Sequence, residues 1–173
     1  NSKNILDDPI EAKKSIGFLP EQPPLYLDMT VKEYLEFVYD LKKCTLNRKK
    51  HLEEICNVVK IDDVYGRVIK NLSKGYKQRV GIARALASKP QIMLMDEPFG
   101  AVDEITRTVL QDSIQELHKQ LKTTIVFVTH NIREALRLSD RVLIINHGRV
   151  EQLDTPEMIQ ANPANEYVER LLR

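Results

Sequence analysis

Residues 92–98 read IMLMDEP, four apolar residues followed by the adjacent carboxylates of Asp96 and Glu97. A continuous apolar run of this kind is typical of a buried strand in a parallel sheet, covered on both faces. Ligands of open α/β sheets bind at the carboxyl ends of the strands. An acid there is costly unless it meets a cation, which Mg²⁺ on nucleotide phosphates supplies. We therefore expect Asp96 to hold the metal shell and Glu97 to polarise an attacking water. For the pair alone, a solvated acidic turn is the alternative.

The segments around this stretch alternate between strand and helix patterns. Three further apolar segments predict strands, namely KKSIGFLP (13–20), TTIVFVTH (123–130) and RVLIINHGRV (141–150). Helices are expected at 103–121 and 131–138, and residues 155–173 read as a short helical tail. Strands that alternate with helices predict an α/β fold with a parallel sheet.

A mostly helical insertion is expected at 30–88, after the first strand. Thr30 precedes VKEYLEFVYDLKK, whose apolar residues recur at helical spacing, and Glu33 completes a capping box. Further helices are expected at 47–60 and at roughly 75–88. The predicted organisation is therefore a core segment 1–29, the insertion 30–88, an α/β core 89–154 and the tail 155–173.

Composition limits the function classes. A chain of 173 residues with 26 basic and 25 acidic groups suits one domain, or one domain with a subdomain, and carries no electrostatic footprint for nucleic acid. No apolar run is long enough to cross a bilayer, and NSKNILDDPIEAKK is too polar for a secretory signal. Cys44 and Cys56 lack metal-site spacing, so reduced thiols and an intracellular location are expected.

A second candidate site is NLSKGYKQRVGIARAL, residues 71–86. Ser73 and Gly75 precede a helix whose free N-terminal amides suit an anion, Gly75 permits close backbone approach, and Ser73 adds a hydroxyl. The segment thus suits a phosphate. A serine that caps a helix for purely structural reasons is the alternative.

Two other polar residues follow predicted strands. His130 ends the run IVFVTH and, if neutral, suits a bond to a phosphate oxygen or a water. Gln22 lies in the proline-rich loop LPEQPP. A satisfied histidine at a strand end and a solvated loop glutamine are the respective alternatives.

In combination, Gln22, LSKGYKQR, IMLMDEP, AVD and VTH occur in an order and spacing that resemble the ATP-binding-cassette (ABC) ATPases. In that family the matching elements are the Q-loop, the signature motif, Walker B, the D-loop and the switch histidine. The resemblance implies the P-loop NTPase (ABC ATPase) type of parallel sheet with a helical subdomain. Tyr76 departs from the glutamine that many members carry there, a variant similar to exporter-type subunits.

The resemblance also implies a role for each matching residue. Asp96 would order Mg²⁺, Glu97 would act as catalytic base, and His130 would contact the γ-phosphate. Gln22 would sense the metal and the nucleophile and couple to a transmembrane permease. The segment of Ser73, Lys74 and Gly75 would clamp ATP held by a second ATPase subunit, and Asp103 would pass information across that dimer interface. Such a subunit would be cytoplasmic and peripheral at the inner face of the membrane, reaching the membrane only through its partner.

None of the six glycines begins the P-loop pattern GxxxxGK[ST], whose amides and lysine cradle the β- and γ-phosphates. The chain resembles the part of an ABC ATPase after its Walker A helix, the N-terminal part being missing. We therefore expect weak or no ATP binding by the chain alone. The sheet is also expected to expose apolar edges beside IMLMD and IVFVT, which favour oligomerisation.

The two halves resemble different subfamilies. Residues 1 to about 87 look like drug- or polymer-exporter ATPases, whereas the rest resembles ATPases of betaine- or choline-type osmoprotectant importers. A join near 87–90 would make the chain an engineered chimera or a natural hybrid. A rival function is a truncated or constructed module that binds a partner without turnover. Soluble ABC proteins of DNA repair or translation usually carry insertions or tandem cassettes that this length excludes.

Overall fold

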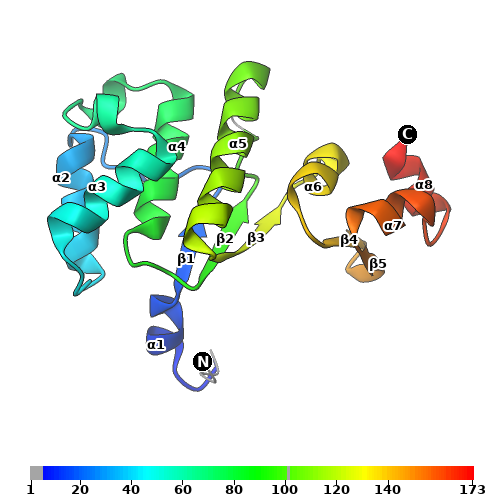
Figure 1. The fold of residues 1–173 in the computed structure, drawn as a ribbon. Coiled ribbons are helices and arrows are strands. Elements are labelled where there is room, and N and C mark those ends of the chain that lie inside the picture. The colour runs from blue at the N-terminus through cyan, green and yellow to red at the C-terminus, as the bar shows by residue number, and fades with distance from the viewer. Residues whose placement is uncertain (1–5, 101) are drawn as a thin grey trace. The chain divides into compact units, whose positions relative to one another are not determined.

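The computed structural model describes residues 6–100 and 102–173. They form two compact units, 1–128 and 129–173, and each is described by itself. The order of helices and strands confirms the α/β class that the sequence predicts (Figure 1).

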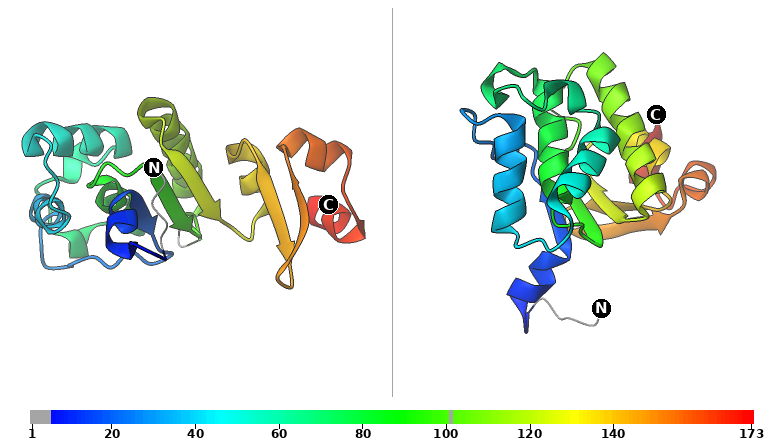
Figure 2. Two further views of the ribbon diagram at one scale, coloured as in Figure 1. Left: turned by 90° about the horizontal axis from the view of Figure 1, so that it is seen from below. Right: turned by 60° about the vertical axis from the view of Figure 1, so that its left-hand side comes forward.

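The first unit is built on a parallel sheet with strand order β1-β2-β3. The strands are β1 (Ile16–Leu19), β2 (Ile92–Asp96) and β3 (Thr124–Val128). Along each strand, side chains alternate between the two faces. One face carries the fully buried Leu19, Met93 and Met95, with α4 (Lys74–Leu86) and α5 (Glu104–Leu121) on that side of the sheet (Figures 1 and 2).

The other face of this sheet is not covered by the helices of the first unit in the residues that the structure describes. Phe18, Leu94 and Val126 are in register across the three strands and are 51%, 37% and 49% exposed. The expectation that IMLMDEP and IVFVTH are covered on both faces was therefore wrong for these residues. Their apolar runs reflect one packed face and one unpacked face, a difference that apolar periodicity does not reveal.

The helices expected within residues 30–88 form close to their predicted bounds. This segment contains α2 (Val31–Leu41), α3 (Arg48–Val59), α4 and two short 3-10 turns at Asp62–Val64 and Ile69–Asn71. The capping box is confirmed, because Glu33 N donates to Thr30 Oγ1 at 3.2 Å and Thr30 N donates to Glu33 Oε2 at 2.8 Å. Asn47 and Ser73 cap the other two helices.

The N-terminal strand is shorter than expected. Instead of one strand over 13–20, the chain forms α1 (Pro9–Lys14) and then β1. Asp8 accepts a hydrogen bond from Glu11 N, and Pro9 occupies the first helical position, where its fixed φ favours a helix. Gly17 lets β1 approach α4, since a Cβ there would lie 2.5 Å from the carbonyl oxygen of Ala85.

The second unit packs a hairpin against three helices. It contains α6 (Ile132–Leu138), β4 (Val142–Asn146), β5 (Arg149–Asp154), α7 (Pro156–Ala161) and α8 (Glu166–Leu172). Val142 and Ile144 pack with Ile159 and Val168 in its core.

The run RVLIINHGRV, predicted as one strand of the parallel sheet, is instead an antiparallel hairpin, so that prediction was wrong. His147 and Gly148 have positive φ values of 46° and 75°, the geometry that two-residue hairpin turns require. The short His-Gly interruption was the sequence signal for this turn.

Both cysteines are free, and burial raises the pKa of Cys56 to about 12, so this thiol stays protonated and unreactive. No helix in the described ranges combines the length and the apolar character that a membrane span requires.

Candidate functional site

The acidic pair lies at the carboxyl end of the central strand. Asp96 is the last residue of β2, is exposed, and is in register with Val128 of β3. Glu97 N donates to Val128 O at 3.0 Å, and Glu97 O accepts from Gly100 N at 3.1 Å. Glu97 has a φ of 42°, a left-handed conformation that costs a residue other than glycine about 1–3 kcal/mol. Neighbouring contacts therefore hold Glu97 in a turn that its own backbone preference opposes.

One of those contacts comes from Gln78 of α4, a residue that the sequence analysis missed. Its Nε2 donates to Pro98 O at 2.9 Å, and the side chain is only 4% exposed. The bond joins the helix that follows the signature segment to the turn that carries Glu97. The signal was available: Gln78 is a polar residue at helical spacing from the apolar positions Ile82 and Gly75.

The signature segment forms the first turn of α4. Ser73 is the N-cap, and its Oγ accepts from Tyr76 N at 3.3 Å. Lys74 is the exposed first residue of the helix, whereas Gly75 is buried. A Cβ at Gly75 would lie 2.3 Å from Cγ2 of Thr106, so glycine is needed where α4 begins against α5.

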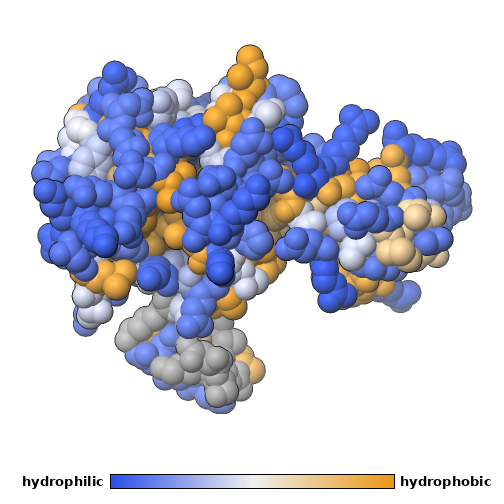
Figure 3. Space-filling model, viewed as in Figure 1, coloured by the Kyte–Doolittle hydropathy of each residue, from blue (hydrophilic) through white to orange (hydrophobic). Residues whose placement is uncertain are grey.

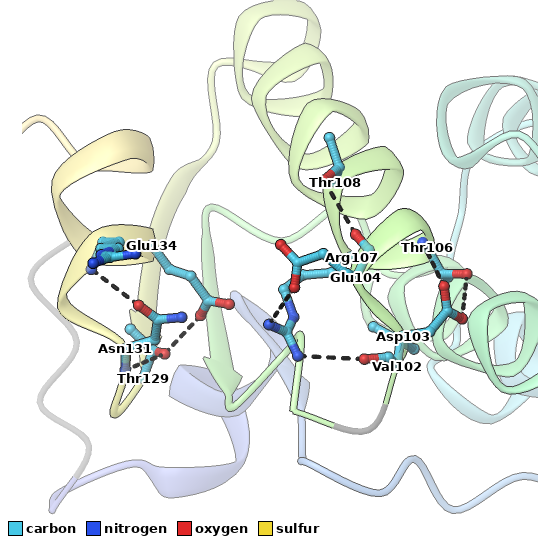
Figure 4. A network of polar contacts seen from close by, with 10 residues as sticks. Val102, Asp103, Glu104, Thr106, Arg107, Thr108, Thr129, Asn131 and Glu134 are labelled. Carbon is cyan, nitrogen blue, oxygen red and sulfur yellow. Dashed lines mark hydrogen bonds and ion pairs between the residues drawn. The ribbon is translucent and has the colours of Figure 1, made fainter.

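Asp103 organises the start of α5 on the other side of this contact. Its carboxylate accepts hydrogen bonds from Thr106 N at 3.0 Å and from Thr106 Oγ1 at 2.8 Å (Figure 4). These bonds favour the ionised form and hold the pKa of Asp103 below its usual value. Thr106 thus bonds to Asp103 and packs against Gly75, which brings two of the predicted site segments together.

Gln22 is an exposed residue of the loop that follows β1. Because β1 is parallel to β2, this loop leaves the sheet at the same edge as Asp96. The next residue, Pro23, packs closely on α4, since a Cβ at Gly81 would lie 2.6 Å from its Cγ. The sheet therefore places the Gln22 loop and the acidic pair at one edge.

His130 belongs to the second unit, where a polar network orders the residues around it (Figure 4). Thr129 Oγ1 donates to Glu134 Oε2 at 2.8 Å, and Asn131 N donates to Thr129 Oγ1 at 3.1 Å. Asn131 also caps α6 by accepting from Arg133 N at 3.0 Å. His130 is exposed on this turn, and its contact with a phosphate stays a prediction.

The carboxylates of Asp96 and Glu97 suit a metal ion whose other ligands are water and the phosphates of a nucleotide. Within the described ranges, no group of three or more histidine, cysteine or acidic side chains is arranged to hold an ion. Mg²⁺ does not need such a group, because it usually binds through one or two carboxylates, waters and nucleotide phosphates. The exposed Asp96, with Glu97 beside it, therefore fits Mg²⁺ carried by a nucleotide.

Comparison with known proteins assigns the family. The model of the family described as ABC transporter matches residues 1–100, more than half of the chain. The chain belongs to the ABC transporter family. Among its curated relatives, the choline transport ATP-binding protein OpuBA of Bacillus subtilis is 42% identical over 99% of the chain and 46% of the relative. The osmoprotectant import ATP-binding protein OsmV of Salmonella typhimurium is 38% identical over 97% of the chain and 45% of the relative. The chain thus spans about half the length of these relatives.

A solved structure supports the same fold. The structure of cbiO1 from Clostridium perfringens, part of the ABC transporter complex cbiONQ, superimposes with a TM-score of 0.78. The match covers 88% of this chain and 61% of that one at 24% sequence identity. The expected P-loop NTPase type of α/β fold is therefore confirmed.

Proposed function

We propose that this ABC transporter chain supplies the hydrolytic and clamping segments of an ATP-binding subunit. The observation that carries the proposal is the turn after β2, where Glu97 is held in a left-handed conformation beside the exposed Asp96. In this proposal Asp96 holds Mg²⁺, which neutralises charge on the phosphates of ATP. The Glu97 carboxylate accepts a proton from the attacking water, as a general base does.

The signature segment serves a second nucleotide. Ser73, Lys74 and Gly75 would contact ATP that is bound by an opposing ATPase subunit, with the hydroxyl and the first helical amides facing its phosphates. Asp103 would report on that contact, because it bonds to Thr106 and Thr106 packs against Gly75. Gln22 and His130 would complete the site as sensors of the nucleophile and of the γ-phosphate.

The proposed partners are a second ATPase subunit and a transmembrane permease gripped near Gln22 and the helical insertion. In this arrangement the chain is peripheral at the cytoplasmic face of the membrane and reaches the bilayer only through the permease. The names of OpuBA and OsmV support transport of small solutes. The matches to OpuBA and OsmV each cover both halves of the chain. The hypothesis that the chain is a chimera stays a prediction.

A second candidate is a folded interaction module without turnover. It is favoured by the sequence of the chain, in which no glycine begins the pattern GxxxxGK[ST]. Without those amides and that lysine, the 173-residue chain is expected to bind ATP weakly on its own.

Mixing experiments separate the two candidates. The chain is combined with a Walker A-bearing ABC cassette whose own signature serine has been mutated, and MgATP hydrolysis is measured. The proposed clamp predicts that the chain restores activity and that a Ser73→Arg variant does not. No restoration with a chain shown to be folded by circular dichroism supports the module without turnover. Hydrolysis by the chain alone, abolished by Glu97→Gln, would show that it needs no P-loop from elsewhere.

A further inference from the structure

A cavity of about 530 Å³ lies between the helical insertion and the amino ends of two strands. Its apolar wall comes from α3, from the end of α4 and from the end of α5, and includes Ile55, Val58, Leu86 and Leu121. Figure 3 shows hydrophobic surface between α3 and α5, bordered by hydrophilic residues. Cavities of 300–1,000 Å³ with mostly apolar walls are the usual sites for small molecules.

The cavity is separate from the candidate nucleotide site. Gln91 and Thr123 line it, and these residues immediately precede β2 and β3. Asp96 and Glu97 lie at the opposite ends of those strands. A strand of five residues spans about 16 Å at roughly 3.3 Å per residue, so a ligand here does not compete with the acidic pair.

The charges around the cavity favour an anion. The charged residues that line the cavity are three lysines, Lys50, Lys89 and Lys122, and one acid, Glu54. Lys50 and Glu54 form a loose ion pair at 4.0 Å, whereas neither Lys89 nor Lys122 takes part in an ion pair within the described ranges. Lys89 and Lys122 follow the ends of α4 and α5, and a full charge outweighs the roughly half charge of each helix end.

The polar groups within the cavity leave few acceptors for these ammonium groups. His51 is 8% exposed, and its Nε2 lies 3.1 Å from Ala87 O. The Oδ1 atom of Asn47 accepts from Lys50 N at 3.1 Å. Both residues line the cavity, so the positive end of α3 lies beside it. The cavity therefore combines an apolar wall with an excess of positive charge at its rim.

We propose that this cavity binds a small amphipathic anion, a molecule with an apolar body and one carboxylate or sulfonate group. The body would pack on Val58, Leu86 and Leu121, and the head group would pair with Lys89 and Lys122. A purely apolar ligand would leave the lysines without a partner, and a compact anion such as acetate would leave the wall uncovered.

The test uses the 173-residue chain and three probes: dodecanoate below its micelle concentration, dodecanol and acetate. Binding is followed by NMR amide shifts, which locate the probe. The proposal predicts that dodecanoate shifts Val58 and Thr123 with the strongest affinity, that dodecanol binds more weakly, and that acetate does not saturate. A Lys89→Gln/Lys122→Gln variant should weaken dodecanoate binding about fivefold, as expected for the loss of two exposed ion pairs.

The matched control is Lys43→Gln/Lys60→Gln. Lys89 and Lys122 have positive φ values of 49° and 50° after helices, and the control lysines have similar values of 51° and 56°. The control lysines do not line the cavity. They should leave the affinity unchanged. A second variant, Leu121→Asp, places a charge on the exposed part of the wall and should abolish binding.

Three results would overturn the proposal. The first is dodecanoate shifts confined to the open sheet face at Phe18, Leu94 and Val126, which would reveal non-specific apolar binding. The second is equal affinity for dodecanoate and dodecanol. The third is saturable binding of acetate with the affinity of dodecanoate, which would show that the apolar wall does not contribute. None of these results bears on ATP hydrolysis, so the proposal and the transporter function fail independently.

Discussion

Asp103 shows how a single carboxylate links stability to pH. Its two bonds to Thr106 lower the pKa of the folded state below the ordinary value of about 3.9. A depressed pKa contributes stability that is present above the unfolded value and is lost as the pH falls through the folded value. The charge on Asp103 thus stabilises the start of α5 at neutral pH.

We predict that Asp103→Asn lowers the urea midpoint at pH 7 and that this difference shrinks as the pH drops below about 4. Asparagine still caps a helix, so the loss at neutral pH reports the charge, whereas Asp103→Ala should lose the cap as well. The measurement is urea unfolding followed by circular dichroism from pH 3 to 7. If the urea midpoints of the unchanged protein and of Asp103→Asn differ by the same amount at every pH, the stabilising role of the Asp103 charge is contradicted.

Gln78 is the other residue that decides the geometry of the site. Its buried amide satisfies Pro98 O, the carbonyl next to Glu97. Gln78→Met keeps the shape of the side chain and leaves this carbonyl without its donor, which should cost about 1–3 kcal/mol of unfolding free energy. Faster hydrogen exchange at Gly100, whose amide bonds to Glu97 O, should accompany the loss.

Lys49→Met, an exposed change on α3, serves as the control for added hydrophobicity. It should alter the unfolding free energy by less than about 0.5 kcal/mol. If Gln78→Met behaves like this control, the bond to Pro98 has no role in holding the turn.

At the scale of elements, α4 and α5 can meet closely because residue 75 is a glycine and has no side chain. Gly75→Ala would drive a methyl group into Cγ2 of Thr106, and overpacking of this kind costs about 1–3 kcal/mol. We predict that Thr106→Ser relieves the clash, since serine lacks the methyl group and keeps the hydroxyl that bonds to Asp103.

A double-mutant cycle measures this coupling. The unfolding free energies of the two single variants and of the double variant should not add, with the double variant more stable than Gly75→Ala. Additive effects would mean that the two helices do not meet at these residues.

The sequence predicted the helices best, because their signals are local. The capping box at Thr30 and the apolar spacing of α2 and α3 lie within single segments, and the structure has both helices within about two residues of their expected bounds. The packing and pairing of the strands were more difficult to predict. The apolar runs of β2 and β4 indicate strands, but they do not indicate which face of each strand is packed or which strand lies next to it. The hairpin turn at His147 and Gly148 was not predicted, because it interrupts an otherwise continuous apolar run by only two residues.

The candidate site was predicted in part for the same reason. Asp96 and Glu97 were found because acids after an apolar run stand out in a sequence. The contacts of Gln78 with Pro98 and of Gly75 with Thr106 join residues separated by 20 or more positions. The helical spacing of Gln78 indicates which side of α4 it lies on, but the partner of each contact depends on how α4 packs, which a local pattern does not contain.

At the scale of the whole molecule, the open sheet face is the main liability of the isolated chain. Phe18, Leu94 and Val126 form an exposed apolar row across three strands. Contiguous apolar surface of this kind favours association. We predict that the chain self-associates as its concentration rises, as measured by sedimentation velocity, and that Leu94→Thr/Val126→Thr shifts it toward monomer.

Threonine suits strands, so this variant should keep the fold. Ile105→Gln is the control, because Ile105 is 80% exposed on α5, away from the sheet. If the unchanged chain, Leu94→Thr/Val126→Thr and Ile105→Gln associate equally, the open sheet face is not the surface through which the chain self-associates.

The central claim is that the turn after β2 places Glu97 to activate water beside a nucleotide-bound magnesium ion. The most direct measurement replaces the matching segment of OpuBA with this chain, so that a P-loop is present in the same polypeptide, and compares ATP hydrolysis with and without Glu97→Gln. We predict that the variant binds ATP as before and hydrolyses it at least about a hundredfold more slowly, the usual range for loss of a general base. An active graft whose hydrolysis rate is unchanged by Glu97→Gln would contradict the account.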